Sequence, residues 1–399
     1  MTPKRFMLIA GEASGDMLAA ELVAELRAGI ARMPTYSANA QPLQADLAPI
    51  FFGAGGPRMA EAGVKLAFDL TQQSLIGLPG PRNYLKLRQR LNQLVALACE
   101  REPHAIVCVD YQLFTSIFAA AVKKRVRARR GPFNNWEPKI IRYISPQVWA
   151  SREKRAYKIA RDFDLVLSIF PFEKDWYAAR VPKLRVEFVG HPLVERHDQV
   201  KHSTRSAELP ASPTVLLLPG SRKRELERHW PVMLAAWQKI QASLPAARAK
   251  AVLPNEELAA MARSSSSQPV KVQVGGLAEA LAEADLAISK TGTITMECAF
   301  FGVPTVAIYI ASGLTYQIGK RIIKVKSLTM PNLLAKEEVF PEFIQHAATP
   351  DNISHAALQL LQNQGRREQV RAKLAEIIAS LGGPGASRRA AEAILAVMR

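Results

Sequence analysis

The segment VLLLPGSRKRE, at residues 215–225, joins a short apolar run to a charged helical pattern through a proline–glycine break. The apolar run predicts a buried parallel strand, and the charged pattern predicts a helix. Gly220, Ser221 and Arg222 then lie on a tight turn at the carboxyl edge of a sheet. Backbone N–H groups and the positive end of the helix dipole suit a phosphate there, and Arg222 adds a matching fork of donors. A plain turn with a surface arginine is the alternative.

A second turn of the same kind follows another apolar run, in the segment SKTGTITMEC at residues 289–298. Thr291, Gly292 and Thr293 would offer N–H groups and hydroxyls to a diphosphate. Glu297 could accept hydrogen bonds from ribose hydroxyls. An ordinary capped helix is the alternative. Two such turns in one half of the chain suggest a nucleotide diphosphate held between helix N-termini.

Short apolar runs alternate with helical patterns along all 399 residues, which predicts doubly wound α/β architecture. A chain of this length is expected to form two domains. A polar stretch rich in serine and proline separates the two halves. We therefore expect a Rossmann-like domain at residues 1–200, a second one at 213–380, and a C-terminal helix at 381–399 that could pack back on the first domain.

Asp110 directly follows the strongly apolar run at residues 105–109. In an open α/β sheet, the ligand crevice lies beyond the carboxyl ends of the strands. A carboxylate at that position can act as a general base. The alternative is an aspartate that caps the next helix.

The charge balance of 53 basic against 35 acidic residues gives a formal net charge of +18. That excess favours an anionic partner, such as nucleic acid, a phosphorylated substrate or an anionic membrane surface. No RNA-binding aromatic motif is present, so we expect no nucleic acid partner.

Membrane contact is expected to be peripheral. The uncharged window at residues 298–319 is long enough for a span, but a Gly-Val-Pro break and polar residues favour a strand at 305–310 followed by a loop. The basic, leucine-rich helix at residues 84–99 and the basic run at 123–130, with Phe133 and Trp136 beyond it, could instead rest on an anionic surface. A core-packed helix and a solvated charged face are the alternatives.

Eight short blocks resemble, in order, those of the lipid-A-disaccharide synthases, a glycosyltransferase family with the GT-B fold. They lie at residues 11–16 (GEASGD), 55–59 (GGPRM), 143–149 (YISPQVW), 170–174 (FPFEK), 188–192 (FVGHP), 218–222 (LPGSR), 291–298 (TGTITMEC) and 330–335 (MPNLLA). Together these blocks are specific.

The resemblance implies two Rossmann-like domains facing across a cleft, and a defined reaction. The family transfers 2,3-diacylglucosamine from UDP to the 6-hydroxyl of 2,3-diacylglucosamine 1-phosphate, with inversion to a β-1,6 bond. Neither a cofactor nor a metal is expected. The implied location is cytoplasmic, peripheral on the inner membrane of a Gram-negative-type bacterium, and a homodimer is left open. The three cysteines, which lack metal spacing, read as reduced thiols and agree with a cytoplasmic location.

The resemblance also assigns residues. Asp110 matches the catalytic base, and Arg222 matches the arginine that binds the diphosphate. Substrate and UDP contacts are expected at Ser14, Gly15, Gly220, Ser221, Arg222, Thr291, Gly292, Thr293, Glu297 and Asn332.

The chain departs from the family pattern at several positions. Leu113 stands where a second aspartate is usual, Lys290 stands where a small residue is usual, and residues 76–81 lack the family's acid. Two other enzymes remain as alternatives, a different GT-B UDP-sugar transferase and a UDP-sugar epimerase. A basic membrane-surface-binding protein without catalysis is the alternative from another class. UDP release that requires the acceptor would separate all of these.

Overall fold

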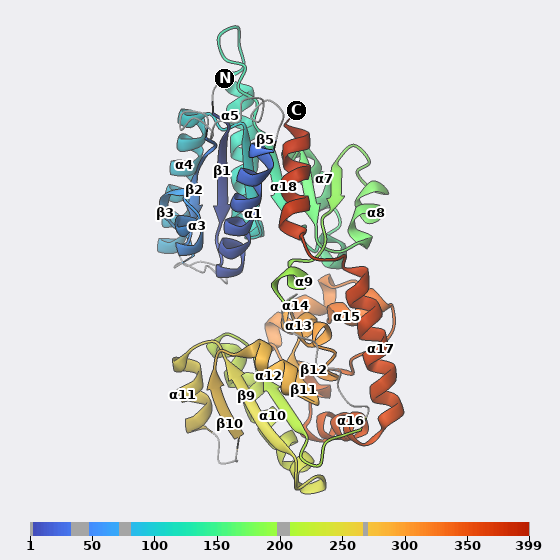
Figure 1. The fold of residues 1–399 in the computed structure, drawn as a ribbon. Coiled ribbons are helices and arrows are strands. Elements are labelled where there is room, and N and C mark those ends of the chain that lie inside the picture. The colour runs from blue at the N-terminus through green and yellow to red at the C-terminus, as the bar shows by residue number, and fades with distance from the viewer. Residues whose placement is uncertain (1–2, 33–47, 72–80, 198–207, 266–269, 399) are drawn as a thin grey trace. The chain divides into compact units, whose positions relative to one another are not determined.

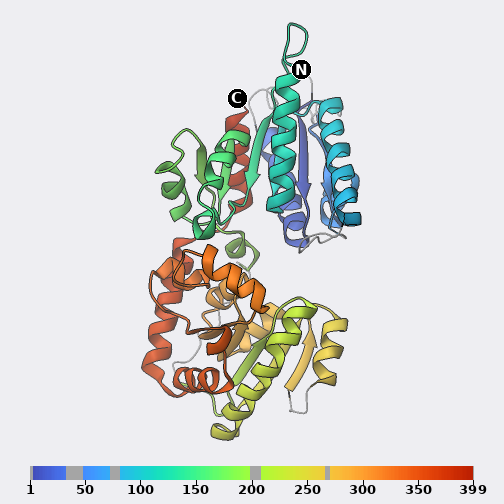
Figure 2. The same cartoon turned by 180° about the vertical axis from the view of Figure 1, so that it is seen from behind.

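The computed structural model describes residues 3–32, 48–71, 81–197, 208–265 and 270–398. The chain divides into two compact units, each a parallel sheet covered by helices (Figure 1; Figure 2). Unit 1 comprises Met1–Glu195 and Gly383–Arg399, and unit 2 comprises Arg196–Gly382.

Unit 1 holds seven described strands in the order β3-β2-β1-β4-β5-β6-β7. The strands are β1 Arg5–Ala10, β2 Ile50–Gly55, β3 Lys65–Asp69, β4 Ala105–Val109, β5 Lys139–Tyr143, β6 Leu165–Ser168 and β7 Arg185–Phe188. The helices are α1 Ala13–Ala31, α3 Pro57–Glu61, α4 Pro81–Arg101, α5 Gln112–Arg129, α6 Val148–Ser151, α7 Arg155–Asp162, α8 Phe172–Ala178, α9 Pro192–Arg196, which ends at the unit boundary, and α18 Ala386–Val397.

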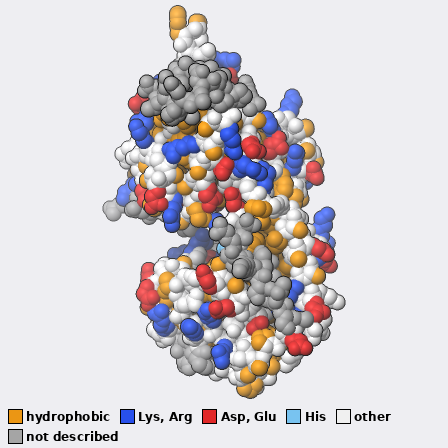
Figure 3. All heavy atoms as spheres, in the orientation of Figure 1, with side chains coloured by type: hydrophobic (Ala, Val, Ile, Leu, Met, Phe, Trp, Pro, Cys, Tyr) orange, Lys and Arg blue, Asp and Glu red, His pale blue; other side chains and the backbone are white. Residues whose placement is uncertain are grey.

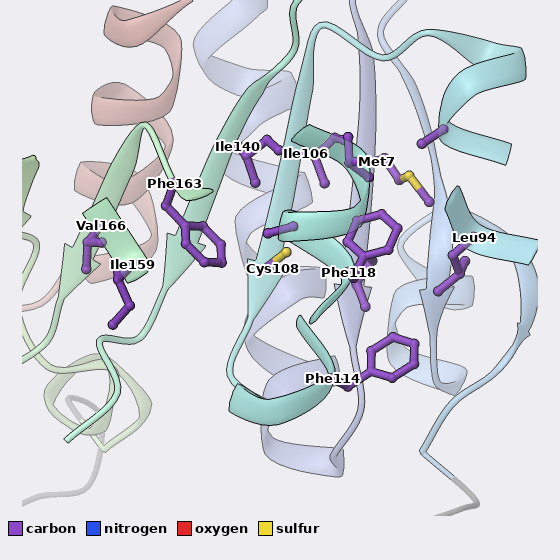
Figure 4. Close-up of a cluster of buried hydrophobic side chains, with 14 of the residues drawn as sticks. Met7, Leu94, Ile106, Cys108, Phe114, Phe118, Ile140, Ile159, Phe163 and Val166 are labelled. Carbon is purple, nitrogen blue, oxygen red and sulfur yellow. The ribbon is translucent and has the colours of Figure 1, made fainter. Parts of the chain in front are cut away.

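The central strands of unit 1 are apolar along their length because helices cover both faces of the sheet. All five residues of β4 are buried. Phe114 and Phe118 of α5 pack against this sheet in the core cluster drawn in Figure 4. The strand order reverses between β1 and β4, so the loops after these two strands flank the crevice where doubly wound sheets bind ligands.

Helix α18 packs on unit 1 although its sequence follows unit 2. Ala390 and Ile394 are fully buried, and α18 runs beside α1 (Figure 1). Leu395 approaches α1 so closely that a Cβ on Gly29 would lie 2.7 Å from its side chain. Arg389 fixes the helix further, because its Nε donates to the carbonyl oxygen of Val189 at 2.7 Å.

Unit 2 holds six described strands in the order β10-β9-β8-β11-β12-β13, with the reversal between β8 and β11. The strands are β8 Thr214–Leu218, β9 Arg248–Leu253, β10 Val270–Val274, β11 Leu286–Lys290, β12 Thr305–Tyr309 and β13 Glu342–Ile344. The helices are α10 Lys223–Ser243, α11 Glu256–Ser264, α12 Leu277–Glu283, α13 Ile294–Phe300, α14 Gly313–Ile322, α15 Met330–Ala335, the 3-10 helix η2 Gln345–Ala347, α16 Pro350–Gln362 and α17 Gln364–Ser380.

Helix α1 begins at Ala13, so Ser14 and Gly15 lie in its first turn. One local expectation is wrong. The segment after β12 forms α14 instead of a loop, because Ser312 caps a helix there and accepts a hydrogen bond from the Thr315 N–H. None of the helices described in either unit is both long and apolar enough to cross a membrane.

Candidate functional site

The two glycine-bearing turns of unit 2 meet in one cavity of about 330 Å³, here called the β8–β11 cavity. It opens where the strand order reverses, at the carboxyl ends of β8 and β11. Five of the expected contact residues line it: Gly220, Ser221, Thr291, Gly292 and Thr293. Gly220 and Gly292 have φ values of +123° and +131°, which favour glycine at both turns.

A carboxylate occupies the polar end of this cavity. Glu225 Oε2 accepts the Ser221 N–H at 3.0 Å, and its Oε1 lies 3.1 Å from Lys290 Nζ and 3.4 Å from Arg222 Nη1. Burial alone would raise the pKa of Glu225, but Lys290, Ser221 and Arg222 together hold this pKa below its ordinary value. The backbone N–H and the two cations thus form a group that binds an anion, and in this structure that anion is the Glu225 carboxylate.

His229 on α10 holds the first turn in place. The ring is almost fully buried, and burial lowers its pKa. Its Nδ1 lies 2.9 Å from the Pro219 carbonyl oxygen, and its Nε2 accepts the Ile310 N–H at 3.0 Å. A neutral ring that donates from Nδ1 satisfies both contacts, so His229 ties the end of β8 to the residue that follows β12.

Two expected ligand contacts have other partners in the structure. Glu297 Oε2 lies 2.7 Å from His197 Nε2, and its other oxygen faces Arg196 at 3.8 Å. The amide of Asn332 makes four hydrogen bonds, which use its full capacity: it donates to the Phe340 carbonyl and to Glu342, and accepts two backbone N–H groups. The Asn332 amide thus holds a loop of unit 2 together, and its contact with a ligand stays a prediction.

In unit 1, Asp110 follows β4 at the point where the strand order reverses. Asp110 and Tyr111 both adopt left-handed backbone conformations, with φ of +47° and +48°. A non-glycine residue in this conformation destabilises the fold by on the order of 1–3 kcal/mol, and such residues cluster at functional sites. Their neighbours hold the bend: the Asp110 N–H donates to Tyr143 O at 3.0 Å, and Gly11 leaves the space that the Tyr111 ring fills.

The charge state of Asp110 is set by opposing influences. Burial raises the pKa of its carboxyl group, while a backbone hydrogen bond from Tyr111 and the charge of Arg142 lower it. Burial dominates, so the pKa lies above the ordinary value for aspartate. A raised pKa suits a general base, which must hold the proton that it takes.

The segments at residues 11–16 and 55–59 of unit 1 are joined by hydrogen bonds. The buried carboxylate of Asp16 accepts the N–H groups of Gly56, Arg58 and Met59, at 2.7 to 3.1 Å. Gly15 packs against Val109, the last residue of β4, and Ser14 is exposed on the first turn of α1. Ser14 therefore lies at the same sheet edge as Asp110, while Gly15 serves packing.

Sequence reasoning missed two buried charged residues near this edge. Arg142 is the fourth of the five residues of β5, between Ile141 and Tyr143, and a charged residue inside such a run is a usable signal. Glu173, on α8, is fully buried and accepts the Trp149 indole N–H at 3.0 Å. Burial raises the pKa of Glu173 to about 7, although the hydrogen bond from Trp149 opposes the rise.

The remaining expectations concern a metal ion and two segments of the chain. In the ranges that the structure covers, no group of three or more His, Cys, Asp and Glu side chains is arranged to hold a metal ion. The departure from the family pattern at residues 76–80, and the first half of the expected linker, residues 202–207, lie outside the described residues.

Comparison with known proteins gives matches over nearly the whole chain. The family model described as lipid-A-disaccharide synthetase matches residues 6–397. A lipid-A-disaccharide synthase of Myxococcus xanthus is 34% identical over 406 residues, covering 99% of this chain and 98% of the relative. One of Geobacter sulfurreducens is 34% identical over 413 residues, covering 100% and 98%.

Solved structures share the fold at low sequence identity. UDP-GlcNAc 2-epimerase from Neisseria meningitidis, solved with UDP-GlcNAc, gives a TM-score of 0.61 at 10% identity, covering 99% of this chain and 100% of that one. MurG of Acinetobacter baumannii gives 0.56 at 13% identity, with the same coverage. The two parallel-sheet units thus have the fold of GT-B glycosyltransferases and epimerases, and the full-length family match shows that the chain belongs to the lipid-A-disaccharide synthase family of UDP-sugar glycosyltransferases.

Proposed function

We propose that this protein transfers 2,3-diacylglucosamine from UDP to the 6-hydroxyl of 2,3-diacylglucosamine 1-phosphate. The observation that carries the proposal is the β8–β11 cavity, where two glycine turns, Lys290 and Arg222 surround a bound carboxylate. A site that already holds one anion by a backbone N–H and two cations is suited to a diphosphate.

In the proposed reaction, Asp110 takes the proton of the acceptor 6-hydroxyl while that oxygen attacks the anomeric carbon of the donor. The bond from this carbon to the phosphate oxygen breaks, and UDP leaves with the electron pair. Attack from the face opposite the leaving group gives inversion to the β anomer. The Ser221 N–H, Lys290 and Arg222 meet the charge that develops on the leaving diphosphate, which lowers the barrier.

Glu225 must leave these donors when the diphosphate arrives, because both anions need the same partners. Its side chain can rotate away from the cavity, while the Ser221 N–H is fixed by the turn. We assign Thr291, Gly292 and Thr293 to the same diphosphate and Ser14 to the acceptor side. Glu297 is assigned to the nucleotide only in a state in which its contact with His197 has opened.

The test is UDP release with synthetic UDP-2,3-diacylglucosamine, with and without the acylated acceptor, followed by mass spectrometry of the product. Release that requires the acceptor, with a disaccharide 1-phosphate as product, supports the transferase. Release of UDP and a free sugar without acceptor would support an epimerase-like reaction instead, and would contradict our proposal.

We further propose that the protein contacts its lipid substrates at a membrane surface, through the first half of α4. Leu85 is 63% exposed there, beside the exposed Lys86 and Arg88. The alternative, the basic end of α5, is less suitable. Lys123 is paired with Asp164 at 2.8 Å, and the Trp136 indole donates to Pro103 O. The exposed Phe133 lies in the loop after the C-terminal end of α5, and the 18-residue helix separates that loop from Asp110 by roughly 27 Å. Hydrophobic side chains lie at the tip of the projection at the top of Figure 3.

Vesicle flotation tests this surface. Anionic vesicles should carry the protein at low salt, and Lys86→Gln with Arg88→Gln should weaken flotation more than Lys124→Gln with Arg125→Gln. Equal flotation by the two double variants would exclude α4 as the docking element. The cytoplasmic location, on the inner face of a bacterial membrane, and a homodimer remain predictions.

A further inference from the structure

A second cavity of about 330 Å³ lies in unit 1, between α5 and α7, and is here called the α5–α7 groove. It is separate from the β8–β11 cavity, which belongs to unit 2. Helices α5 and α7 follow neighbouring strands and lie on the same face of the sheet (Figure 2). Its apolar wall includes Leu113, Ile117 and Ala120 of α5, and Ile159 and Phe163 at the α7 side.

Two large apolar side chains on this wall face solvent. Leu113 is 66% exposed and Ile117 is 45% exposed, and they lie one helical turn apart on the same face of α5. Phe114 and Phe118 each follow one of these residues, about 100° further around the helix, and fill the core (Figure 4). An exposed apolar pair beside a cavity is a feature of ligand-binding grooves, which gain stability when an apolar ligand covers them.

The groove is also positively charged. Arg155 and Lys158 of α7 line its rim, and neither forms an ion pair with any residue that the structure describes. Arg161 is different, because Asp162 binds it through two hydrogen bonds of 2.7 Å. An apolar wall with two uncompensated cations at its rim matches an amphiphile that carries an anionic group.

A buried cation lies beneath the groove. Arg142 donates to Ser116 Oγ at 2.8 Å, and its guanidinium lies 4.3 Å from the centre of the Phe163 ring. Ser116 and Phe163 both line the groove. The Nε and Nη1 groups of Arg142 are fully buried without a hydrogen-bond partner among the described residues. This positive charge adds to the rim charges and favours an anion nearby.

The groove begins at the catalytic edge of the sheet. Leu113 lies three residues after Asp110, on the first turn of α5, and Pro146 and Val148 follow the end of β5. We infer that the α5–α7 groove binds one acyl chain of the acceptor, with the acceptor 1-phosphate at Arg155 and Lys158. This inference rests on the proposed function, since it names where the acceptor of that reaction is held.

Ile117→Asn tests the apolar wall, with Ile50→Asn as its control. Ile50 is 38% exposed in the same unit. It is the first residue of β2, so it lies at the amino ends of the strands, whereas the groove begins at their carboxyl ends. The assay measures kcat and KM with acceptors of graded acyl length. For the wild type, each methylene removed should raise the acceptor KM up to about fourfold. Ile117→Asn should raise the KM of the long-chain acceptor at least tenfold and flatten this series, and Ile50→Asn should do neither.

Arg155→Gln with Lys158→Gln tests the rim, against Lys124→Gln with Arg125→Gln at the far end of α5, which removes the same charge. The rim variant should raise the KM of the 1-phosphate acceptor at least tenfold and leave the KM of an acceptor without phosphate nearly unchanged. The value of kcat with saturating acceptor should stay near that of the wild type in all variants, which reports that unit 1 is folded, and UDP affinity should stay constant.

Several results would overturn the inference. Equal acceptor KM values for Ile117→Asn and Ile50→Asn would remove the groove from acceptor binding. If Ile117→Asn changed only how KM depends on the acyl length of the donor, the groove would bind the donor instead of the acceptor. If the proposed function itself were wrong, the wild-type protein would release no UDP with any acceptor.

Discussion

Lys290 Nζ lies 3.1 Å from Oε1 of Glu225, inside the cavity formed by the two glycine turns of unit 2. The carboxylate therefore holds the donors that a diphosphate would need. We expect Glu225→Gln to bind UDP more tightly, by roughly tenfold, since one charge-assisted contact is worth about 1.5 kcal/mol or more. Uridine, which has no phosphate, should bind the variant and the wild type equally. Calorimetry with both ligands measures the difference, and weaker UDP binding would show that Glu225 supports the site.

Arg222→Ala should weaken UDP binding by about 1.5–3 kcal/mol, the cost of a lost hydrogen bond to a charged group. Arg224→Ala is the matched control, because Arg224 is exposed like Arg222 and lies two residues away, in the first turn of α10, but has no ion pair with Glu225. Uridine binding should be unchanged in both. Equal losses for UDP and uridine would indicate a damaged fold.

Asp110→Asn should lower turnover by roughly two orders of magnitude or more, which is the usual contribution of a general base. UDP binding by unit 2 should be nearly intact, because the two residues are equal in size and Asp110 belongs to unit 1. Steady-state kinetics and UDP calorimetry on the same preparation provide the measurement. Turnover within a few-fold of wild type would remove Asp110 from the mechanism.

Activity should rise with pH as Asp110 loses its proton, with a midpoint above the ordinary range for aspartate, because burial raises the pKa of this group. Arg142 lowers the same pKa, so Arg142→Met should move the acidic limb of kcat/KM to higher pH. Arg142→Lys keeps the charge and should move the limb less. An unchanged limb in Arg142→Met would mean that another group controls it.

Glu173→Gln should change stability in a pH-dependent way. Burial raises the pKa of Glu173 from 4.5 to about 7, so its protonated form stabilises the fold below about pH 4.5 and this contribution is lost as pH rises to 7. The glutamine variant should match wild type near pH 4.5 and exceed its stability above pH 7 by up to about 3 kcal/mol. Hydrogen exchange of unit 1 amides at both pH values tests this.

The features that the sequence predicts correctly are local ones. The apolar run before Gly220 and the one before Asp110 both end where the structure ends β8 and β4, because strand, turn and helix patterns are written in neighbouring residues. The number of units and their α/β class follow from the same alternation.

The features that the sequence does not predict depend on distant partners. Nothing near Asn332 announces that its amide is used by residues 339–342, or that Lys123 pairs with Asp164. The occupied anion site is a similar case, since the contact of Glu225 with Lys290 joins two turns 65 positions apart. The α5–α7 groove escapes prediction because exposure of Leu113 and Ile117 is a property of packing.

The return of α18 to unit 1 has a consequence for how the protein is made. Unit 2 is an insertion, read between the two segments of unit 1. During synthesis, β1 to β7 are made before unit 2, but the helix that covers α1 is made after it, with its buried residues Ala390 and Ile394. Domains usually complete folding in the order in which they are synthesised. In this chain the order is reversed: unit 2 has its whole sequence available first, and unit 1, although its translation begins earlier, can be completed only after α18 has been translated.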